Sequence, residues 1–250
     1  MKVKYTVDNL LLQIKSFIIE TLFPSFCLGC QREGSLLCQD CKSTLDILHY
    51  NYCLCSKNPI RIIESQKGKC QRCQNKKLSG LYFALPYKEK FLTKKLIYQF
   101  KYPPRLKSLS KHLAQIIIEH LLITKNNTEK VWQNSIILPV PLEKYGLKYR
   151  GYNQSEELAK EFSKITKTPL ILNNLIKIKE TKSQTKLSAQ ERQENVRGVF
   201  SIKNPEVILN KKVFLIDDVY TTGSTMEECA NVLRTFGAKS VWGIAIAREG

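Results

Sequence analysis

The chain has 250 residues, 43% of them hydrophobic, and its 40 basic and 22 acidic residues give a formal net charge of +18. This length allows one or two domains, and the apolar fraction is enough for a buried core, so a chain too polar to fold is excluded. No apolar run reaches membrane-spanning length, and charged residues interrupt the N-terminal segment. We therefore expect neither a membrane span nor a secretory signal, but a cytoplasmic protein.

The excess of positive charge favours an anionic partner, with nucleic acid and a phosphorylated ligand as the two main classes. Most of the basic residues are lysines, on a chain that is also rich in Ile and Asn. That composition is also typical of a genome-wide preference, so the charge alone does not identify a partner.

The first predicted element is an amphipathic helix over residues 10–23, which ends before Pro24. Its apolar positions recur at helical spacing, so one face must be covered. Packing on the rest of the protein is the favoured interpretation, because the outer face lacks the lysines typical of a helix that lies on a membrane surface.

Eight of the cysteines then fall within residues 27–73. In a reducing compartment such a cluster favours metal ligands over disulfides, and four thiolates in tetrahedral reach are what a structural Zn²⁺ needs. Buried free cysteines or a redox motif are the alternatives, but a segment with so few large apolar residues needs metal to fold. The candidate ligands are Cys27, Cys30, Cys38 and Cys41 for one site, and Cys53, Cys55, Cys70 and Cys73 for a second.

The pair Cys53 and Cys55 is spaced more tightly than a standard Cys-x-x-Cys knuckle. The second site is therefore the weaker prediction, and we expect one or two zinc ions per chain. Cys229 lies far from both sets, in a predicted helix, and is expected to be a core residue.

A basic stretch with aromatic residues follows a predicted strand over residues 81–87. Helices are expected over 91–100 and 106–122, and between Lys88 and Lys111 lie eight Lys or Arg and one acid. Cations with interleaved aromatics are typical of single-stranded nucleic acid binding, whereas a solvated lysine face over an aromatic core is the equal alternative. The nucleic-acid candidates are Lys94, Lys95, Tyr98, Lys101 and Tyr102.

A second strand is predicted over residues 135–140, followed by a basic loop and a helix over 155–166. This loop carries Arg150 and Gly151. Backbone N–H groups and a planar guanidinium at the carboxyl edge of a sheet suit a pyrophosphate, so these two residues are the candidates for a pyrophosphate loop.

Residues 169–179 are expected to hold one or two short strands. The polar segment 180–197 shows no apolar stripe and contains Lys186 and Arg192. It is typical of a mobile lid over an active site, with a helical turn near residues 187–196.

The stretch 213–225 is the most informative one. An apolar strand over 213–216 precedes Asp217 and Asp218, and a loop of hydroxyls and one glycine leads into a helix over 226–236. In an open α/β sheet the carboxyl ends of the strands bind ligands, and the helix N-terminus attracts phosphate. The acids then suit ribose hydroxyls or Mg²⁺, while an ordinary strand–turn–helix with Ser and Thr caps is the alternative. The loop residues are Thr221, Thr222, Gly223, Ser224 and Thr225.

This stretch resembles the motif by which type I phosphoribosyltransferases bind phosphoribosyl pyrophosphate (PRPP). The resemblance implies an α/β fold with a doubly wound, mostly parallel sheet, and PRPP bound with Mg²⁺. Tyr220 is bulkier than the aliphatic residue common in that motif.

More widely, the chain resembles the ComF/GntX-like family of competence-associated proteins, with a zinc-ribbon head and a phosphoribosyltransferase-like body. The resemblance adds Gln184 to the lid candidates Lys186 and Arg192, and implies a small zinc-binding domain over residues 1–80 and a phosphoribosyltransferase-like domain over 81–250. The matching stretches are the cysteine clusters, 100–102, 138–141, 150–154, 183–187 with Arg192, 195–198 and 217–225.

The family implies handling of incoming single-stranded DNA during natural transformation, with a DNA-translocating helicase and a recombination mediator as partners. It does not imply that a transfer reaction occurs. The alternatives are an active phosphoribosyltransferase, in which an acceptor nitrogen attacks C1 of the ribose and pyrophosphate leaves, and a PRPP-responsive regulator. The regulator ranks last, because the sequence shows no clear helix-turn-helix. The sequence does not identify an acceptor.

Overall fold

The computed structural model describes residues 24–63, 68–87, 91–124, 131–142, 147, 149–179 and 189–249. The helix expected over residues 10–23 lies outside this part of the chain. The chain divides into two compact units, residues 1–45 and residues 46–250. The division separates the two cysteine sets, while a domain boundary near residue 80 stays a prediction.

The smaller unit is built on turns around its cysteines. Its helix α2 (Gln39–Ser43) begins after Cys38, whose sulfur accepts a hydrogen bond from the backbone N–H of Cys41. Arg32 pairs with Asp40 at 2.8 Å, with both side chains 70% exposed. An exposed pair of this kind contributes little stability, so the described part of this unit depends on its cysteines.

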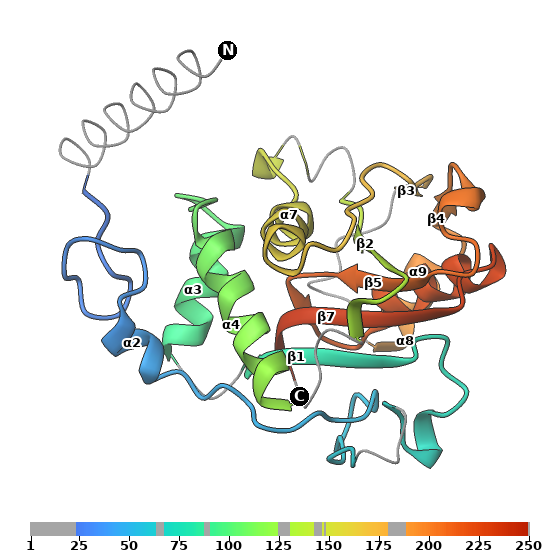
Figure 1. Cartoon of the computed structure of the whole chain (residues 1–250), viewed down its shortest axis with the longest axis horizontal. Coiled ribbons are helices and arrows are strands. Elements are labelled where there is room, and N and C mark those ends of the chain that lie inside the picture. The colour runs from blue at the N-terminus through green and yellow to red at the C-terminus, as the bar shows by residue number, and fades with distance from the viewer. Residues whose placement is uncertain are drawn as a thin grey trace. The chain divides into compact units, whose positions relative to one another are not determined.

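The larger unit contains a parallel sheet in the order β1-β7-β5-β2 (Figure 1). Each strand is a short apolar run buried on both sides, as expected for a parallel sheet. The strands are β1 (Gly80–Pro86), β7 (Ser240–Arg248), β5 (Lys212–Ile216) and β2 (Ser135–Pro139), and β6 (Val219–Tyr220) adds a short pairing to β7. The strands expected near residues 81–87, 135–140 and 213–216 are thus confirmed.

Helices cover both faces of this sheet. On one face, α9 (Ser224–Thr235) buries Met226 and Leu233 in the same cluster as Leu81 and Leu215. Because side chains alternate along a strand, Phe214 faces the other side of the sheet. There the ring of Trp132 contacts the rings of both Phe214 and Phe162. That second face is covered by α4 (Leu109–Thr124) and α7 (Gln154–Thr166), and α3 (Phe91–Lys101) packs beside α4. This is the doubly wound α/β arrangement that the sequence predicted.

A small antiparallel sheet joins β3 (Leu175–Lys177) and β4 (Phe200–Ile202). Between them lies α8 (Ala189–Val196), close to the helical turn expected at 187–196. Two 3-10 turns complete the unit, η1 (Gln71–Cys73) and η3 (Pro205–Val207). None of the helices in the described ranges is long and apolar enough to cross a membrane.

Candidate functional site

The acid pair, Asp217 and Asp218, directly follows β5 at the carboxyl edge of the sheet. Asp217 Oδ1 accepts hydrogen bonds from the Ser155 hydroxyl and from the backbone N–H of Asp218, both at 2.9 Å. Asp218 is 7% exposed, and its Oδ1 accepts from the backbone N–H of Val219 at 2.6 Å. Both carboxyl groups are therefore fixed in place, as a preorganised binding site requires.

The protonation of Asp217 is unusual. Desolvation raises the pKa of its carboxyl to about 7, and the adjacent charge of Asp218 contributes to this rise, while Lys101 and the Ser155 hydroxyl act in the opposite direction. Two carboxyl groups that share a site cannot both ionise freely. A strongly perturbed acid at the ligand-binding edge of an α/β sheet favours a functional site.

Residues 221–225 form what we call the phosphate loop, which leads into the N-terminus of α9. Gly223 has φ +78° and precedes the first helical residue, Ser224, in a left-handed conformation that favours glycine. Thr222 Oγ1 lies 2.9 Å from Ser224 Oγ. The predicted loop residues therefore lie together at the N-terminus of a helix, where N–H groups and the helix dipole attract anions. The phosphate itself stays a prediction.

Tyr220 lies directly beneath this loop. It is 2% exposed, and a Cβ atom built on Gly223 would lie 2.1 Å from its hydroxyl oxygen. The hydroxyl donates a hydrogen bond to the carbonyl of Leu54 at 3.4 Å. Leu54 stands between Cys53 and Cys55, so the bulky residue connects the phosphate loop to the second cysteine set.

Arg150 and Gly151 lie in the loop between β2 and α7. Because Pro139 of β2 is paired with Ile216 of β5, this loop leaves the sheet beside the acid pair. Gly151 has φ +78°, which again favours glycine. The structure therefore brings the two predicted pyrophosphate residues to the same edge as the acids.

Lys101, one of the nucleic-acid candidates from the sequence, lies beside the acid pair. It pairs with Asp218, with 2.9 Å between Nζ and Oδ1 and only 21% of its side chain exposed. Desolvation acts to lower the pKa of Lys101, but the charges of Asp218 and Asp217 outweigh that cost, so its pKa is raised even though Arg150 opposes the shift. Lys101 thus belongs to the acid pair and not to the outer surface of α3.

The end of α3 is held by residues that follow β2. The Tyr152 hydroxyl donates to the carbonyl of Phe100 at 2.6 Å, and Gln154 Nε2 donates to the same oxygen at 3.4 Å. The last carbonyls of a helix lack partners within the helix, so these donors satisfy one of them. They also fix the position of Lys101, the next residue along the chain.

The remaining nucleic-acid candidates are Lys94, Lys95, Tyr98 and Tyr102. Together with Phe91 they form what we call the aromatic–basic face, on one side of α3 and just beyond its end. Lys94 is exposed, Tyr98 is 56% exposed, and Phe91 is 80% exposed. The rings of Tyr98 and Tyr102 lie 5.0 Å apart between centroids. Spacings of three and four residues place these side chains on one side of the helix, and contact with nucleic acid stays a prediction.

The expected lid is described only in part. Gln184 and Lys186 lie outside the described residues, and for Arg192 the structure describes the backbone, within α8. After this helix, the backbone N–H of Gly198 donates to Glu228 Oε1 of α9 at 2.8 Å. The C-terminal end of the segment is thus attached to the helix that carries the phosphate loop.

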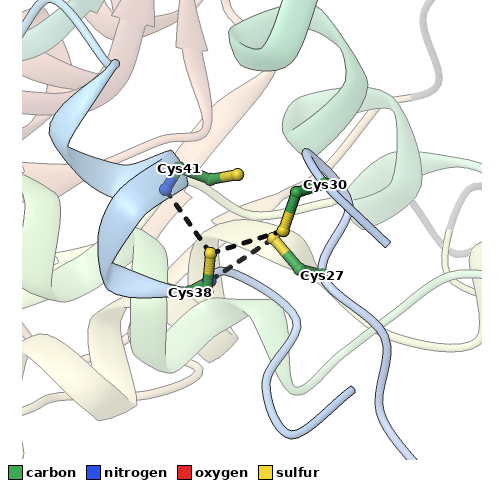
Figure 2. A group of neighbouring side chains, drawn as sticks. All are labelled: Cys27, Cys30, Cys38 and Cys41. Carbon is green, nitrogen blue, oxygen red and sulfur yellow. Dashed lines mark hydrogen bonds between the residues drawn. The ribbon is translucent and has the colours of Figure 1, made fainter. Parts of the chain in front are cut away.

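The first cysteine set lies in the smaller unit (Figure 2). All four sulfurs lie within 4.8 Å of one another, and those of Cys30 and Cys38 are 3.6 Å apart. A tetrahedral Zn²⁺ with Zn–S distances of about 2.3 Å places its sulfurs about 3.8 Å apart. The backbone N–H groups of Gly29 and Cys38 both point to Cys27 Sγ at 3.4 Å. Such donors stabilise a thiolate ligand, so the set fits zinc.

The second set lies in the larger unit and includes both Cys53 and Cys55, within 4.8 Å of Cys70 and Cys73. The close spacing of Cys53 and Cys55 in the sequence therefore does not prevent either sulfur from joining the set. Arg248, which is 2% exposed, donates to the carbonyls of Cys53 and Cys55 from the end of β7. The number of bound ions stays a prediction. Cys229 is fully buried in the core, as expected.

Three roles escaped sequence reasoning: those of Ser155, Tyr152 and Lys101. The sequence predicts Ser155 only as the start of a helix, whereas the structure shows that its hydroxyl donates to Asp217. The stretches 100–102 and 150–154 both carried the family resemblance. Their contact through the Phe100 carbonyl is a tertiary fact that neither stretch reveals alone.

Comparison with known proteins gives consistent matches. A family described as phosphoribosyl transferase domain matches residues 109–249. Competence protein F of Haemophilus influenzae is 35% identical over 156 residues, which cover 61% of this chain and 67% of that protein. The DNA utilization protein YhgH of Salmonella typhi is 28% identical over 58% of this chain and 63% of that protein. Competence protein ComFC of Streptococcus pneumoniae is 27% identical over 87% of this chain and 90% of that protein.

The matches therefore span about two thirds of the first two relatives and nearly all of the third. Together with the parallel sheet and its flanking helices, they confirm the phosphoribosyltransferase-like α/β fold that the 217–225 motif predicted.

Proposed function

The chain belongs to the phosphoribosyl transferase domain family and to the ComF family of competence proteins, and on this premise we propose that it handles incoming single-stranded DNA during natural transformation and binds PRPP. Two of its relatives are named as competence proteins and another as a DNA utilization protein. The proposed role lies on the cytoplasmic side, with a DNA-translocating helicase and a recombination mediator as partners.

One observation carries the ligand assignment. The acid pair directly follows β5, and the phosphate loop starts three residues after Asp218 and leads into α9. Carboxylates and a helix N-terminus therefore lie close together. A sugar phosphate needs both: acceptors for ribose hydroxyls and N–H donors for a phosphate. Arg150 adds a planar guanidinium at the same edge, which suits a pyrophosphate.

The residues also fit the metals that the family implies. Asp217 and Asp218 offer the hard carboxylate oxygens that Mg²⁺ prefers when it accompanies a phosphorylated ligand. The eight cysteines offer two sets of four thiolates for structural zinc. In the proposed ligand complex, Asp217 and Asp218 would hold Mg²⁺, which would neutralise phosphate charge, while the chain's own residues orient the ribose and the phosphates.

Replacing both acids by Asn tests this assignment. We expect the Asp217→Asn, Asp218→Asn variant to fold and to bind PRPP with Mg²⁺ at least about tenfold more weakly, because charge-assisted hydrogen bonds to the ligand are lost. Calorimetric titration measures the change. Glu161→Gln, which removes an acid paired with Lys164 at 2.6 Å on α7, is the control and should bind as the parent does. Equal affinity in the double variant would exclude the acid pair as the ribose site.

An active phosphoribosyltransferase is the second candidate function. It is favoured by the attachment of the expected lid segment to α9 through Gly198 and Glu228. A lid over the active site would exclude water during a transfer reaction. Incubating the protein with PRPP, Mg²⁺ and each nucleobase in turn, and measuring pyrophosphate release, distinguishes the candidates. Release that depends on one base would establish an enzyme.

A further inference from the structure

Lys101 is the most enclosed cation among the ion pairs of the described residues. Its side chain is 21% exposed, whereas the basic partners in the other pairs are between 36% and 70% exposed. It lies against Asp218, itself 10% exposed at the side chain, within the site described above. An exposed lysine pair contributes little and can form by chance, but an enclosed one must be built by the fold.

The fold builds this pair from three separate stretches. Lys101 ends α3, and the carbonyl just before it is held by Tyr152 and Gln154 from the loop after β2. Asp218 follows β5, more than a hundred residues further along the chain, and the backbone N–H of Val219 fixes the same oxygen that Lys101 contacts. The ammonium group is thus directed at one chosen carboxylate oxygen.

The charges of the site explain why a cation is needed there. Asp217 and Asp218 are adjacent, and desolvation adds to their mutual repulsion. A cation within hydrogen-bond distance favours the ionised form of a carboxyl and offsets this repulsion. Among the ion pairs of the described residues, Lys101 is the cation in direct contact with the acid pair.

The contact between Lys101 and Asp218 affects which ligands can bind at the acid pair. Asp218 Oδ1 is a carboxylate oxygen of the type that coordinates a divalent cation or accepts a hydrogen bond from a ribose hydroxyl. It already contacts the ammonium group of Lys101 and accepts a hydrogen bond from the backbone N–H of Val219. A divalent cation that approached alone would meet the like charge of the ammonium group. A phosphorylated sugar brings its own anionic groups, to which the displaced ammonium can move.

We infer that Lys101 is the resident counter-cation of the acid pair. It holds the Asp218 carboxyl in place before a ligand binds and excludes a lone divalent cation. It moves to the ligand's phosphate groups when a phosphorylated sugar binds together with its metal. Lys101 is therefore a ligand-site residue and not a nucleic-acid contact; the identity of the sugar phosphate rests on the proposed function.

Binding of Mn²⁺ alone tests the exclusion of metal, without any sugar phosphate. In the zinc-loaded full chain, we expect Lys101→Met to bind Mn²⁺ at least about tenfold more tightly than the parent, because an opposing charge is removed from the acid pair. Water-proton relaxation or electron paramagnetic resonance measures this affinity. The gain should disappear when Asp218→Asn is added, and Lys101→Arg, which restores the charge, should bind Mn²⁺ as weakly as the parent.

Lys164→Met is the matched control, since it removes a lysine from a pair with Glu161 on the surface of α7. It should leave Mn²⁺ binding unchanged. If Lys101→Met does not fold, Lys101→Gln supplies a second neutral side chain that retains a hydrogen-bond donor. Equal Mn²⁺ affinity in the parent and in a folded neutral variant would overturn the counter-cation role.

A PRPP titration tests the second half of the inference. With Mg²⁺ present, Lys101→Met should bind PRPP at least about tenfold more weakly, because one charge-assisted contact to the ligand is lost. Unchanged affinity would overturn the transfer of Lys101 to the ligand. If the parent binds no PRPP while Lys101→Met still gains Mn²⁺ affinity, the ligand proposed above is wrong but the counter-cation role stands.

Discussion

The carboxyl of Asp217 has a pKa of about 7, which desolvation and the charge of Asp218 raise from the ordinary value of 3.8. The folded protein therefore binds this proton more tightly than the unfolded chain does. It follows that Asp217 favours folding below its unfolded pKa, and that this contribution is lost as the pH rises toward 7. At higher pH the ionised carboxylate destabilises the empty site.

Asp217→Asn should accordingly raise the melting temperature of the ligand-free protein at pH 8. Asn keeps an oxygen that can accept from Ser155 but carries no charge beside Asp218. A gain of about 1 kcal/mol would raise the melting temperature by about 2–4 °C for a chain of this size. Thermal unfolding at pH 8 and pH 5 measures it, and the gain should shrink at pH 5. A lower melting temperature at pH 8 would show that Asp217 stabilises the fold as an anion.

The second cysteine set supports the element that carries the phosphate loop. Tyr220 contacts the Leu54 carbonyl, and Arg248 contacts the carbonyls of Cys53 and Cys55, so β6 and β7 both end against this set. Glu227 of α9 accepts from the backbone N–H groups of Lys77 and Leu78, just after the set. The phosphate loop is thus attached to the cysteine set on both of its sides.

Cys55→Ser should therefore affect both zinc content and ligand binding. We expect zinc to fall from two ions to one per chain, the melting temperature to fall by about 2–4 °C for each kcal/mol lost, and PRPP to bind more weakly. Cys30→Ser, in the other unit, should remove one zinc ion without weakening PRPP binding. Metal analysis, thermal unfolding and calorimetry measure these effects. Weaker PRPP binding in Cys30→Ser alone would contradict the assigned support.

For the whole molecule, the net charge of +18 predicts DNA binding that depends steeply on salt. On a single strand each neutralised phosphate contributes a slope of about −0.7 in log affinity against log salt concentration. Lys94→Gln with Lys95→Gln should flatten that slope by as much as about 1.4 if both contact phosphate. Fluorescence anisotropy at several salt concentrations measures the slope, and Lys203→Gln, exposed beyond β4, serves as the control.

Tyr98→Ala should lower the affinity by about 1–3 kcal/mol with little change of slope, if a base stacks on its exposed ring. Lys101→Met should leave the slope unchanged, because its ammonium group is enclosed with Asp218. If neither the lysine nor the tyrosine variants change binding, the aromatic–basic face is only a solvated surface. Any DNA contact would then lie elsewhere on the chain.

The sequence alone determined what depends on local pattern. Apolar runs specify strands, helical spacing specifies helices, and the acid–acid, Thr-Thr-Gly-Ser-Thr pattern at 217–225 specifies a strand, a loop and a helix N-terminus. These patterns predicted the phosphate loop and both cysteine sets, and the resemblance that they carry implied the doubly wound α/β fold. Element boundaries shifted by a few residues, as with α4, which begins at Leu109 and not at 106.

Only the tertiary structure decided which charges meet. Lys101 lies in a run of lysines, and no local pattern distinguishes it from Lys94 or Lys95. Its environment is set by Tyr152 and Gln154 at the end of α3 and by Asp218 far along the chain. The electrostatic energy of a side chain depends on its distance to partners from other elements and on its burial, and neither quantity is written in the local sequence.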